Sequence, residues 1–255
     1  MRKINLFFFS LFLAVLISLP IFCVDRYLSH PDIPWQLVPF NADSLSQRYK
    51  ENYLQLKPDA LVLKLQDSSK PLVMVIIDGW GVPYDESLLK KDFDFFAPLK
   101  ASFATHKRLL QHTSHAENVE YKRGFKEGIL LENGDSYVCA RKSREQACHF
   151  GQTLCCQDCN DLRAVDALDS LISTGSWKKI AWTAHETREG DRDKLHDLLK
   201  ELVALIDRYP DVQFVIQGAH RPLLGLPEVR RKYLAPWVPV VFVNCLPKKS
   251  ALIEP

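Results

Sequence analysis

Residues 72–81 read Leu72-Val-Met-Val-Ile-Ile-Asp78-Gly79-Trp80-Gly81. The apolar run is rich in β-branched residues and stops abruptly at a carboxylate, so it predicts a strand that is buried on both faces of a sheet. Open α/β sheets bind ligands at the carboxyl ends of their strands, which is where Asp78 stands. Gly79 permits a sharp turn and a close approach of the backbone to a ligand. A solvated Asp-Gly turn after an ordinary strand is the competing interpretation, and both stay open at this point.

The length and the charge of the chain set outer bounds on its function. The 255 residues are enough for one large α/β domain or two small ones after an N-terminal segment is set aside. There are 33 basic and 31 acidic residues, which gives a formal net charge of +2. This near balance supplies no electrostatic attraction to nucleic acid, so we expect no nucleic-acid partner.

Residues 1–24 are predicted to be a signal anchor or a signal peptide. Arg2 and Lys3 precede an apolar run over 6–24, which is just long enough to cross a hydrocarbon core of about 30 Å as a helix. Pro20 favours a cleaved signal, whereas the lack of small residues before position 24 favours an uncleaved anchor. Positive charge keeps the N-terminus inside. We therefore expect a membrane-anchored or secreted protein with its domain on the extracytoplasmic side.

The remaining chain alternates between predicted strands and helices. A proline-interrupted juxtamembrane lead over 25–70 precedes an α/β domain over 71–247, and a tail follows at 248–255. The predicted strands are 72–77, 108–111, 178–183, 212–217 and 238–243, and the predicted helices are 85–99, 162–173 (with Asp161 as a candidate N-cap) and 190–209. Alternating elements predict an α/β fold with a mostly parallel central sheet flanked by helices.

Residues 128–139 carry a hairpin signal. Two apolar runs flank Asn133-Gly134, and Asn-Gly favours the positive φ angles of a type I′ turn. We therefore expect an antiparallel hairpin that turns at these two residues.

A cysteine-rich insertion is predicted over 139–160. Setting aside Cys23 leaves six cysteines, five of them between 139 and 159, in a compartment that permits disulfides. Six cysteines allow 15 pairings, among which the sequence does not choose. The Cys156-x-x-Cys159 spacing also suits a redox pair or a structural zinc site, so disulfides are the first expectation and the other two stay open.

Polar residues follow three of the predicted strands. Asp78, His185 and His220 each stand at or just beyond a strand end, and in a parallel sheet such ends share one edge. A carboxylate and two imidazoles are ligand types expected for Zn²⁺ or another divalent metal, and a nearby hydroxyl would serve as the nucleophile. Each histidine alone is better explained as a packed or solvated residue, whereas three such residues at one edge leave a site and ordinary packing equally open.

These motifs resemble the alkaline phosphatase superfamily, which includes sulfatases, nucleotide pyrophosphatases and cofactor-independent phosphoglycerate mutases. The stretch 72–81 is similar to the first metal-binding strand of that superfamily, and the order of the later elements over 70–245 also fits. The resemblance implies that Asp78, His185 and His220 are metal ligands. It also implies that Thr113 is the nucleophile, with Ser114 as its rival.

The same resemblance implies a phosphate-ester substrate. Metal ions would lower the pKa of the nucleophile and stabilise in-line displacement. Arg221 is expected to contact the substrate oxygens through its planar guanidinium group.

The chain departs from the superfamily pattern at several positions. Ala219 stands where the family has the Asp of an Asp-His pair, no acidic residue occupies 181–184, and no histidine follows His220. Two metals need about six ligands. Two hypotheses follow: a metal-dependent hydrolase or transferase with a reduced site, or a pseudoenzyme of the same fold that serves as a binding or assembly module. No G-x-S-x-G, P-loop or G-x-G-x-x-G motif supports a third class.

Overall fold

The computed structural model describes residues 53–56, 69–107, 128–134, 151–187, 189–222, 227–230, 232–234 and 237–252. All of these belong to the second of two compact units, Met1–Leu45 and Ser46–Pro255. The predicted N-terminal segment and most of the lead lie outside the described residues, as do Thr113 and Ser114. Within the described ranges, no helix has the length and apolar character needed to cross a bilayer.

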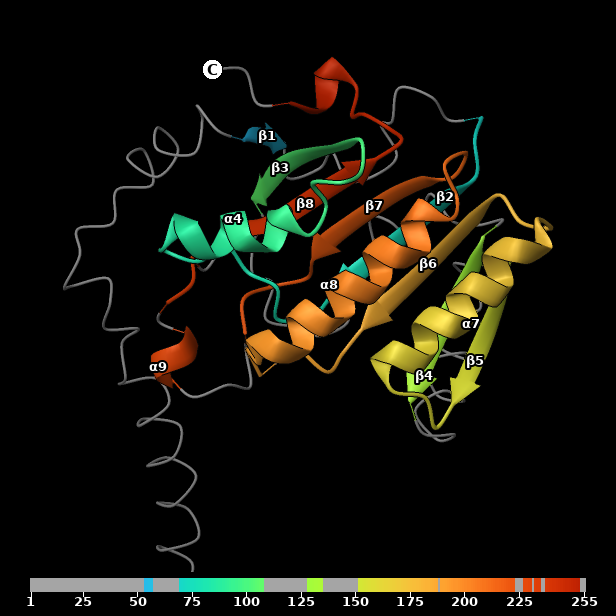
Figure 1. Cartoon of the computed structure of the whole chain (residues 1–255), viewed down its shortest axis with the longest axis horizontal. Coiled ribbons are helices and arrows are strands. Elements are labelled where there is room, and N and C mark those ends of the chain that lie inside the picture. Colours follow the sequence, from blue (N-terminus) through green and yellow to red (C-terminus); the bar gives the residue numbers. More distant parts are fainter. Residues whose placement is uncertain are drawn as a thin grey trace, which may run out of the picture. The chain divides into compact units, whose positions relative to one another are not determined.

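The described part of the domain is built on one eight-stranded sheet with the order β1-β3-β8-β7-β2-β6-β4-β5 (Figure 1). Its strands are β1 (Leu54–Leu56), β2 (Leu72–Ile77), β3 (Ala101–Lys107), β4 (Ile129–Gly134), β5 (Gln152–Gln157), β6 (Lys179–Ala184), β7 (Gln213–Gly218) and β8 (Trp237–Val243). The predicted strand at 72–77 is therefore confirmed. The predicted strand at 108–111 lies outside the described residues, and β3 ends just before it.

The sheet is mixed, which corrects the expectation of a mostly parallel one. β8 runs antiparallel to both of its neighbours, β3 and β7, whereas the other pairings are parallel. A parallel return needs a long crossover, usually a helix. Within the described residues of the connection from β7 to β8, the only helix is the four-residue α9 (Pro227–Arg230). β8 therefore begins at the same end of the sheet where β7 stops, and Gln217 near the end of β7 pairs with Val240 near the start of β8.

Among the described residues, three longer helices each connect two strands of the sheet. They are α4 (Glu86–Asp94), α7 (Asp161–Thr174) and α8 (Arg192–Asp207), and a short 3₁₀ turn, η2 (Lys249–Ala251), lies near the C-terminus. All three crossovers move the chain in the same direction across the sheet, so right-handed connections place the helices over one face. Figure 1 shows α4, α8 and α7 over that face.

The helix ends follow ordinary capping chemistry, with one correction. Asp85 and Asp191 cap α4 and α8 with their carboxylates. The cap of α7 is Asn160, whose side chain accepts from the backbone N–H of Arg163 at 2.9 Å, rather than Asp161. Asp161 is instead the first helical residue and is almost fully buried, which leaves its carboxylate for other contacts.

The core surrounds β2. All six of its residues are buried, as the continuous apolar run predicts. Leu72, Met74 and Ile76 belong to an apolar cluster with side chains of β4, β6, β7 and β8. The amphipathic stripe of α8 is also buried, with Leu195, Leu198, Leu199, Leu202, Leu205 and Ile206.

The predicted hairpin at Asn133-Gly134 is wrong. Both residues belong to β4, which pairs in parallel with β5 and β6. The Asn133 side chain is buried and hydrogen-bonded: its Oδ1 accepts from Trp182 Nε1 at 3.1 Å and its Nδ2 donates to Asp161 Oδ1 at 3.0 Å. These tertiary contacts outweigh the local turn preference of Asn-Gly.

The cysteine-rich insertion is partly described and contains strand β5. Cys156 and Cys159 form a disulfide, and Cys155 is disulfide-bonded as well. Cys245, at the other end of the sheet, is a free thiol. The expectation of disulfides is therefore confirmed for this segment, while Cys139 and Cys148 lie outside the described residues.

Candidate functional site

The three predicted strand-end residues meet at one edge of the sheet. β2 lies between β7 and β6, and Ile77 is level with Gly218 on one side and Ala184 on the other. Asp78, the next residue, therefore stands between the loops that carry His220 and His185. Gly79 has a φ angle of 83°, so it supplies the sharp turn that the sequence predicts.

Asp78 contacts both histidines through its carboxylate. Its Oδ2 lies 2.7 Å from Nδ1 of His185, and its Oδ1 lies 3.6 Å from Nε2 of His220. A carboxylate only accepts, so Nδ1 of His185 carries the shared proton. Nδ1 of His220 lies 2.8 Å from the carbonyl oxygen of Arg221 and donates to it. Nε2 is therefore the ring nitrogen of His220 that faces Asp78.

The cluster is more open on one side than on the other. The side chains of Asp78 and His220 are 6% and 8% exposed, whereas that of His185 is 26% exposed. Charge on Asp78 is therefore surrounded by low-dielectric protein, which strengthens its interaction with any cation or donor.

The loop after β6 is held by hydrogen bonds from polar side chains. Oδ1 of Asp161 accepts the backbone N–H of His185 at 3.1 Å, and Oδ2 accepts that of Glu186 at 2.7 Å. The Thr187 hydroxyl donates to the carbonyl oxygen of Asp78. Sequence reasoning missed these supports, because Asp161 resembles a helix cap.

The loop after β7 is held by close packing, together with a hydrogen bond from the backbone N–H of Ala219 to the carbonyl oxygen of Ile77 at 2.9 Å. A Cβ placed on Gly218 would lie 1.8 Å from the carbonyl oxygen of Trp80, and one on Gly81 would lie 2.8 Å from Cα of Arg221. Ala219, His220 and Arg221 are all buried. The two backbones therefore lie too close together for any larger side chain at either glycine.

A buried polar network fixes Trp80, two residues after Asp78. Its Nε1 donates to Asp92 of α4 at 3.0 Å, and Asp92 also accepts from Arg192 and lies 3.1 Å from Nε2 of His196, both on α8. Burial raises the pKa of Asp92, and Arg192, Trp80 and His196 oppose that rise. This network joins two helices to the turn that carries Asp78.

The described residues do not fit a two-metal centre. They contain no group of three or more His, Cys, Asp or Glu side chains arranged to hold a metal ion. The 2.7 Å contact of His185 with Asp78 is a hydrogen bond rather than a ligand-to-ligand spacing. Asp78 and His220 supply two of the three or more protein ligands that a zinc site needs, and the Nδ1–H of His220 is bonded to a backbone carbonyl oxygen, as it is in ligating histidines.

The remaining predicted site residues have different outcomes. Arg221 lies beside His220 and against Gly81, close to the cluster. Its role in binding substrate stays a prediction, as does metal ligation by Asp78, His185 and His220. The candidate nucleophiles Thr113 and Ser114 lie outside the described residues.

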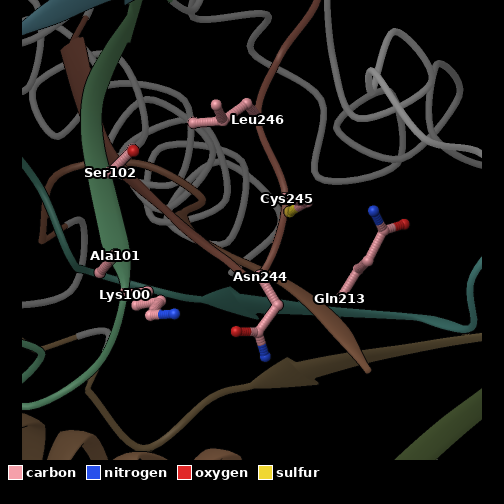
Figure 2. A pocket seen from close by; sticks show the side chains of 7 residues that line it. All are labelled: Lys100, Ala101, Ser102, Gln213, Asn244, Cys245 and Leu246. Carbon is pink, nitrogen blue, oxygen red and sulfur yellow. The ribbon is translucent and has the colours of Figure 1, made fainter. Parts of the chain in front are cut away.

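A pocket of about 500 Å³ lies at the opposite edge of the sheet (Figure 2). Its lining comes from the start of β3, the start of β7 and the residues after β8, namely Lys100, Ala101, Ser102, Gln213, Asn244, Cys245 and Leu246. Because Gln213 begins β7 whereas His220 follows its end, this pocket is separate from the Asp78 cluster.

Comparison with known proteins gives likenesses of fold. No family model and no curated protein matches the chain. One similar solved structure is the lipoteichoic acid synthase LtaP from Listeria monocytogenes, with 11% sequence identity and a TM-score of 0.45 over 68% of this chain and 65% of that one. A second is a protein in the alkaline phosphatase superfamily from Vibrio parahaemolyticus, with 10% identity and a TM-score of 0.41 over 71% of this chain and 60% of that one. A third is the C-terminal periplasmic domain of phosphoethanolamine transferase EptC from Campylobacter jejuni, with 9% identity and a TM-score of 0.36 over 74% of this chain and 82% of that one. At these identities the likeness concerns the fold alone.

Proposed function

We propose that this chain is an extracytoplasmic protein of alkaline phosphatase-like fold, tethered by its N-terminal segment, that hydrolyses or transfers phosphate esters at the Asp78 cluster. One observation supports this above all others. His185 and His220, which are 107 and 142 residues from Asp78 in sequence, both reach its carboxylate. Three ionisable side chains that share one buried contact at the carboxyl edge of a sheet are typical of a site.

Each residue has a definite role in this proposal. Asp78 and His220 hold a single divalent ion, zinc first, which when bound supplies Lewis-acid stabilisation of phosphoryl oxygens. The proton that His185 shares with Asp78 sits on Nδ1, so Nε2 is the ring atom that accepts a proton from a hydroxyl nucleophile. Thr113, or else Ser114, is that nucleophile, and Arg221 contacts the substrate oxygens.

Metal content and turnover test the proposal together. The purified chain is dialysed against zinc, its metal is quantified, and hydrolysis is followed on a panel of nitrophenyl phosphate mono- and diesters. Asp78→Asn is expected to lose bound zinc and at least 100-fold in turnover, and Thr113→Ala to lose turnover while keeping the metal. The matched control Asp193→Asn, an exposed residue of α8, keeps both. A wild-type chain with neither zinc nor turnover would contradict the proposal.

The second candidate is a catalytically inactive module of the same fold that binds or assembles at the cell envelope. It is favoured by Ala219, which is buried where the superfamily carries a metal-binding Asp, and by the burial of Asp78 and His220. In this case Asp78→Asn leaves the cellular function intact, as complementation of a deletion strain would show.

A further inference from the structure

The Asp161 carboxylate accepts hydrogen bonds from the loop that carries His185. The residue is 2% exposed at the first turn of α7. It accepts three hydrogen bonds: from Nδ2 of Asn133 and from the backbone N–H groups of His185 and Glu186. Two of its three donors therefore belong to consecutive residues of one loop. A buried carboxylate is costly unless it is hydrogen-bonded, so this arrangement strongly favours one loop conformation.

The loop is held from its other side by Asp78. The ring of His185 donates to the Asp78 side chain, and the Thr187 hydroxyl donates to the Asp78 backbone carbonyl. Asp161 and Asp78 thus fix the segment 185–187 between them. The position of the His185 backbone relative to α7 decides whether its Nδ1 reaches Oδ2 of Asp78.

The Cys156–Cys159 disulfide constrains the start of α7. It closes a four-residue loop between the end of β5 and the cap residue Asn160, directly before Asp161. The carbonyl oxygen of Cys159 also lies 3.4 Å from Nδ2 of Asn133, which is the side chain that donates to Asp161. The disulfide and the carboxylate therefore belong to one continuous set of contacts that ends at Asp78.

We infer that Asp161 is a positioning residue that holds His185 against Asp78, and that the Cys156–Cys159 disulfide holds Asp161 in place. The role in chemistry rests on the proposed function, because it matters for turnover only if the Asp78 cluster acts on substrate. The effect on the His185 ring is independent of any activity. The His185 tautomer therefore tests the inference directly.

The first experiment measures the protonation of the His185 ring by long-range ¹H–¹⁵N NMR of the full chain at pH 8, above the ordinary imidazole pKa of about 6.5. The wild-type ring is expected to carry its proton on Nδ1. In Asp161→Asn an amide NH₂ faces at least one of the three N–H donors, so the ratio of Nδ1–H to Nε2–H tautomer is expected to fall at least threefold. The control Asp166→Asn removes the same charge from an exposed site on α7 and leaves the ratio unchanged. A folded Asp161→Asn with an unchanged ratio overturns the inference.

The second experiment removes the disulfide in the double variant Cys156→Ser/Cys159→Ser. Amide hydrogen exchange at His185 and Glu186 is expected to speed up at least tenfold, together with a fall in the Nδ1–H tautomer. Cys245→Ser, which changes a free thiol at the other edge of the sheet, is the control and leaves both amides protected. Unchanged exchange in the double variant overturns the role of the disulfide, and it does so even if Asp161→Asn fails to fold.

Zinc affinity separates this inference from the proposed function. If the wild-type chain binds zinc through Asp78 and His220, Asp161→Asn is expected to leave its zinc affinity unchanged, because Asp161 contacts the His185 loop and neither of these two ligands. A wild-type chain that binds no zinc but loses its Nδ1–H tautomer in Asp161→Asn contradicts the proposed function and supports the positioning role. A wild-type chain that binds zinc, together with an Asp161→Asn variant whose tautomer ratio is unchanged, supports the proposed function and contradicts the positioning role.

Discussion

The loops on the two sides of Asp78 are built on different principles. The loop after β6, residues 185–187, is fixed by hydrogen bonds from Asp161 and to Asp78, and its histidine is partly exposed. The loop after β7, residues 219–222, is fixed by packing against Trp80 and Gly81, and its histidine is buried. Both loops deliver an imidazole to the same carboxylate.

The difference predicts different responses to mutation. Hydrogen bonds to one carboxylate are local, so the β6 loop can be loosened while the fold is kept. Close backbone packing leaves no room to relax, so changes in the β7 loop are transmitted to β2 and to the core. The β6 loop is therefore the adjustable side of the site and the β7 loop the rigid side.

The largest expected effect is that of Gly218→Ala. The added methyl group would lie 1.8 Å from the carbonyl oxygen of Trp80, which is backbone and cannot move aside without shifting the Asp78 turn. We expect a loss of more than about 4 kcal/mol in the free energy of unfolding, measured by urea denaturation, which is exceptional for one methyl group.

Gly175→Ala is the matched control for this change. Gly175 has a φ angle of 63° but no atom within 4 Å of an added Cβ, so only backbone strain of about 1–2 kcal/mol opposes the alanine. If Gly218→Ala is no more destabilising than Gly175→Ala, the β7 loop is not held by packing and the contrast between the loops fails.

A smaller effect is expected from Thr187→Val in the β6 loop. Valine keeps the shape of the buried side chain but removes the hydroxyl that donates to the Asp78 carbonyl. A lost hydrogen bond of this kind costs about 1–2 kcal/mol, and we expect faster hydrogen exchange confined to 185–187. Thr183→Val, the same substitution on β6, is the control. Global unfolding of the Thr187→Val variant would show that the β6 loop is as rigid as its counterpart.

The strands and helices with strong local patterns were predictable from the sequence. The strand at 72–77 and the buried stripe of α8 are confirmed. Both are visible in the sequence because buried apolar residues recur there with the spacing of a strand or of a helix. The meeting of Asp78, His185 and His220 also follows, since neighbouring parallel strands end at one edge. The orientation of β8 did not follow, because it depends on the path of a connection with little regular structure.

The supports of the site were hidden for a physical reason. Asp161 and Asn160 are both good capping residues, so the sequence did not reveal which of them caps α7 and which turns inward. Asn133 carries a strong turn signal that Trp182, 49 residues away, overrides. Asp92 has charged neighbours in the sequence of α4, but its side chain is buried and contacts Trp80 and two side chains of α8. Such roles depend on contacts between distant segments, which no local pattern records.

The smallest expected effect on stability concerns Cys245, and it asks whether the rigid packing of β7 extends to its other end. The thiol donates to the carbonyl oxygen of Phe214 at 3.4 Å, and burial raises its pKa to about 12. Because the folded pKa lies above the unfolded one, its contribution to stability is fully present below about pH 8.5 and is lost as the pH rises towards 12.

Cys245→Ser should therefore leave the pH dependence of unfolding unchanged between pH 6 and 8. At pH 9 the thiolate fraction is roughly 800-fold below that of an ordinary thiol with a pKa of about 8.5, so alkylation by iodoacetamide should be slower by a similar factor. Labelling at the rate of a free peptide would show that β7 is tightly packed only where it meets Trp80, and would confine the rigid side of the site to that contact.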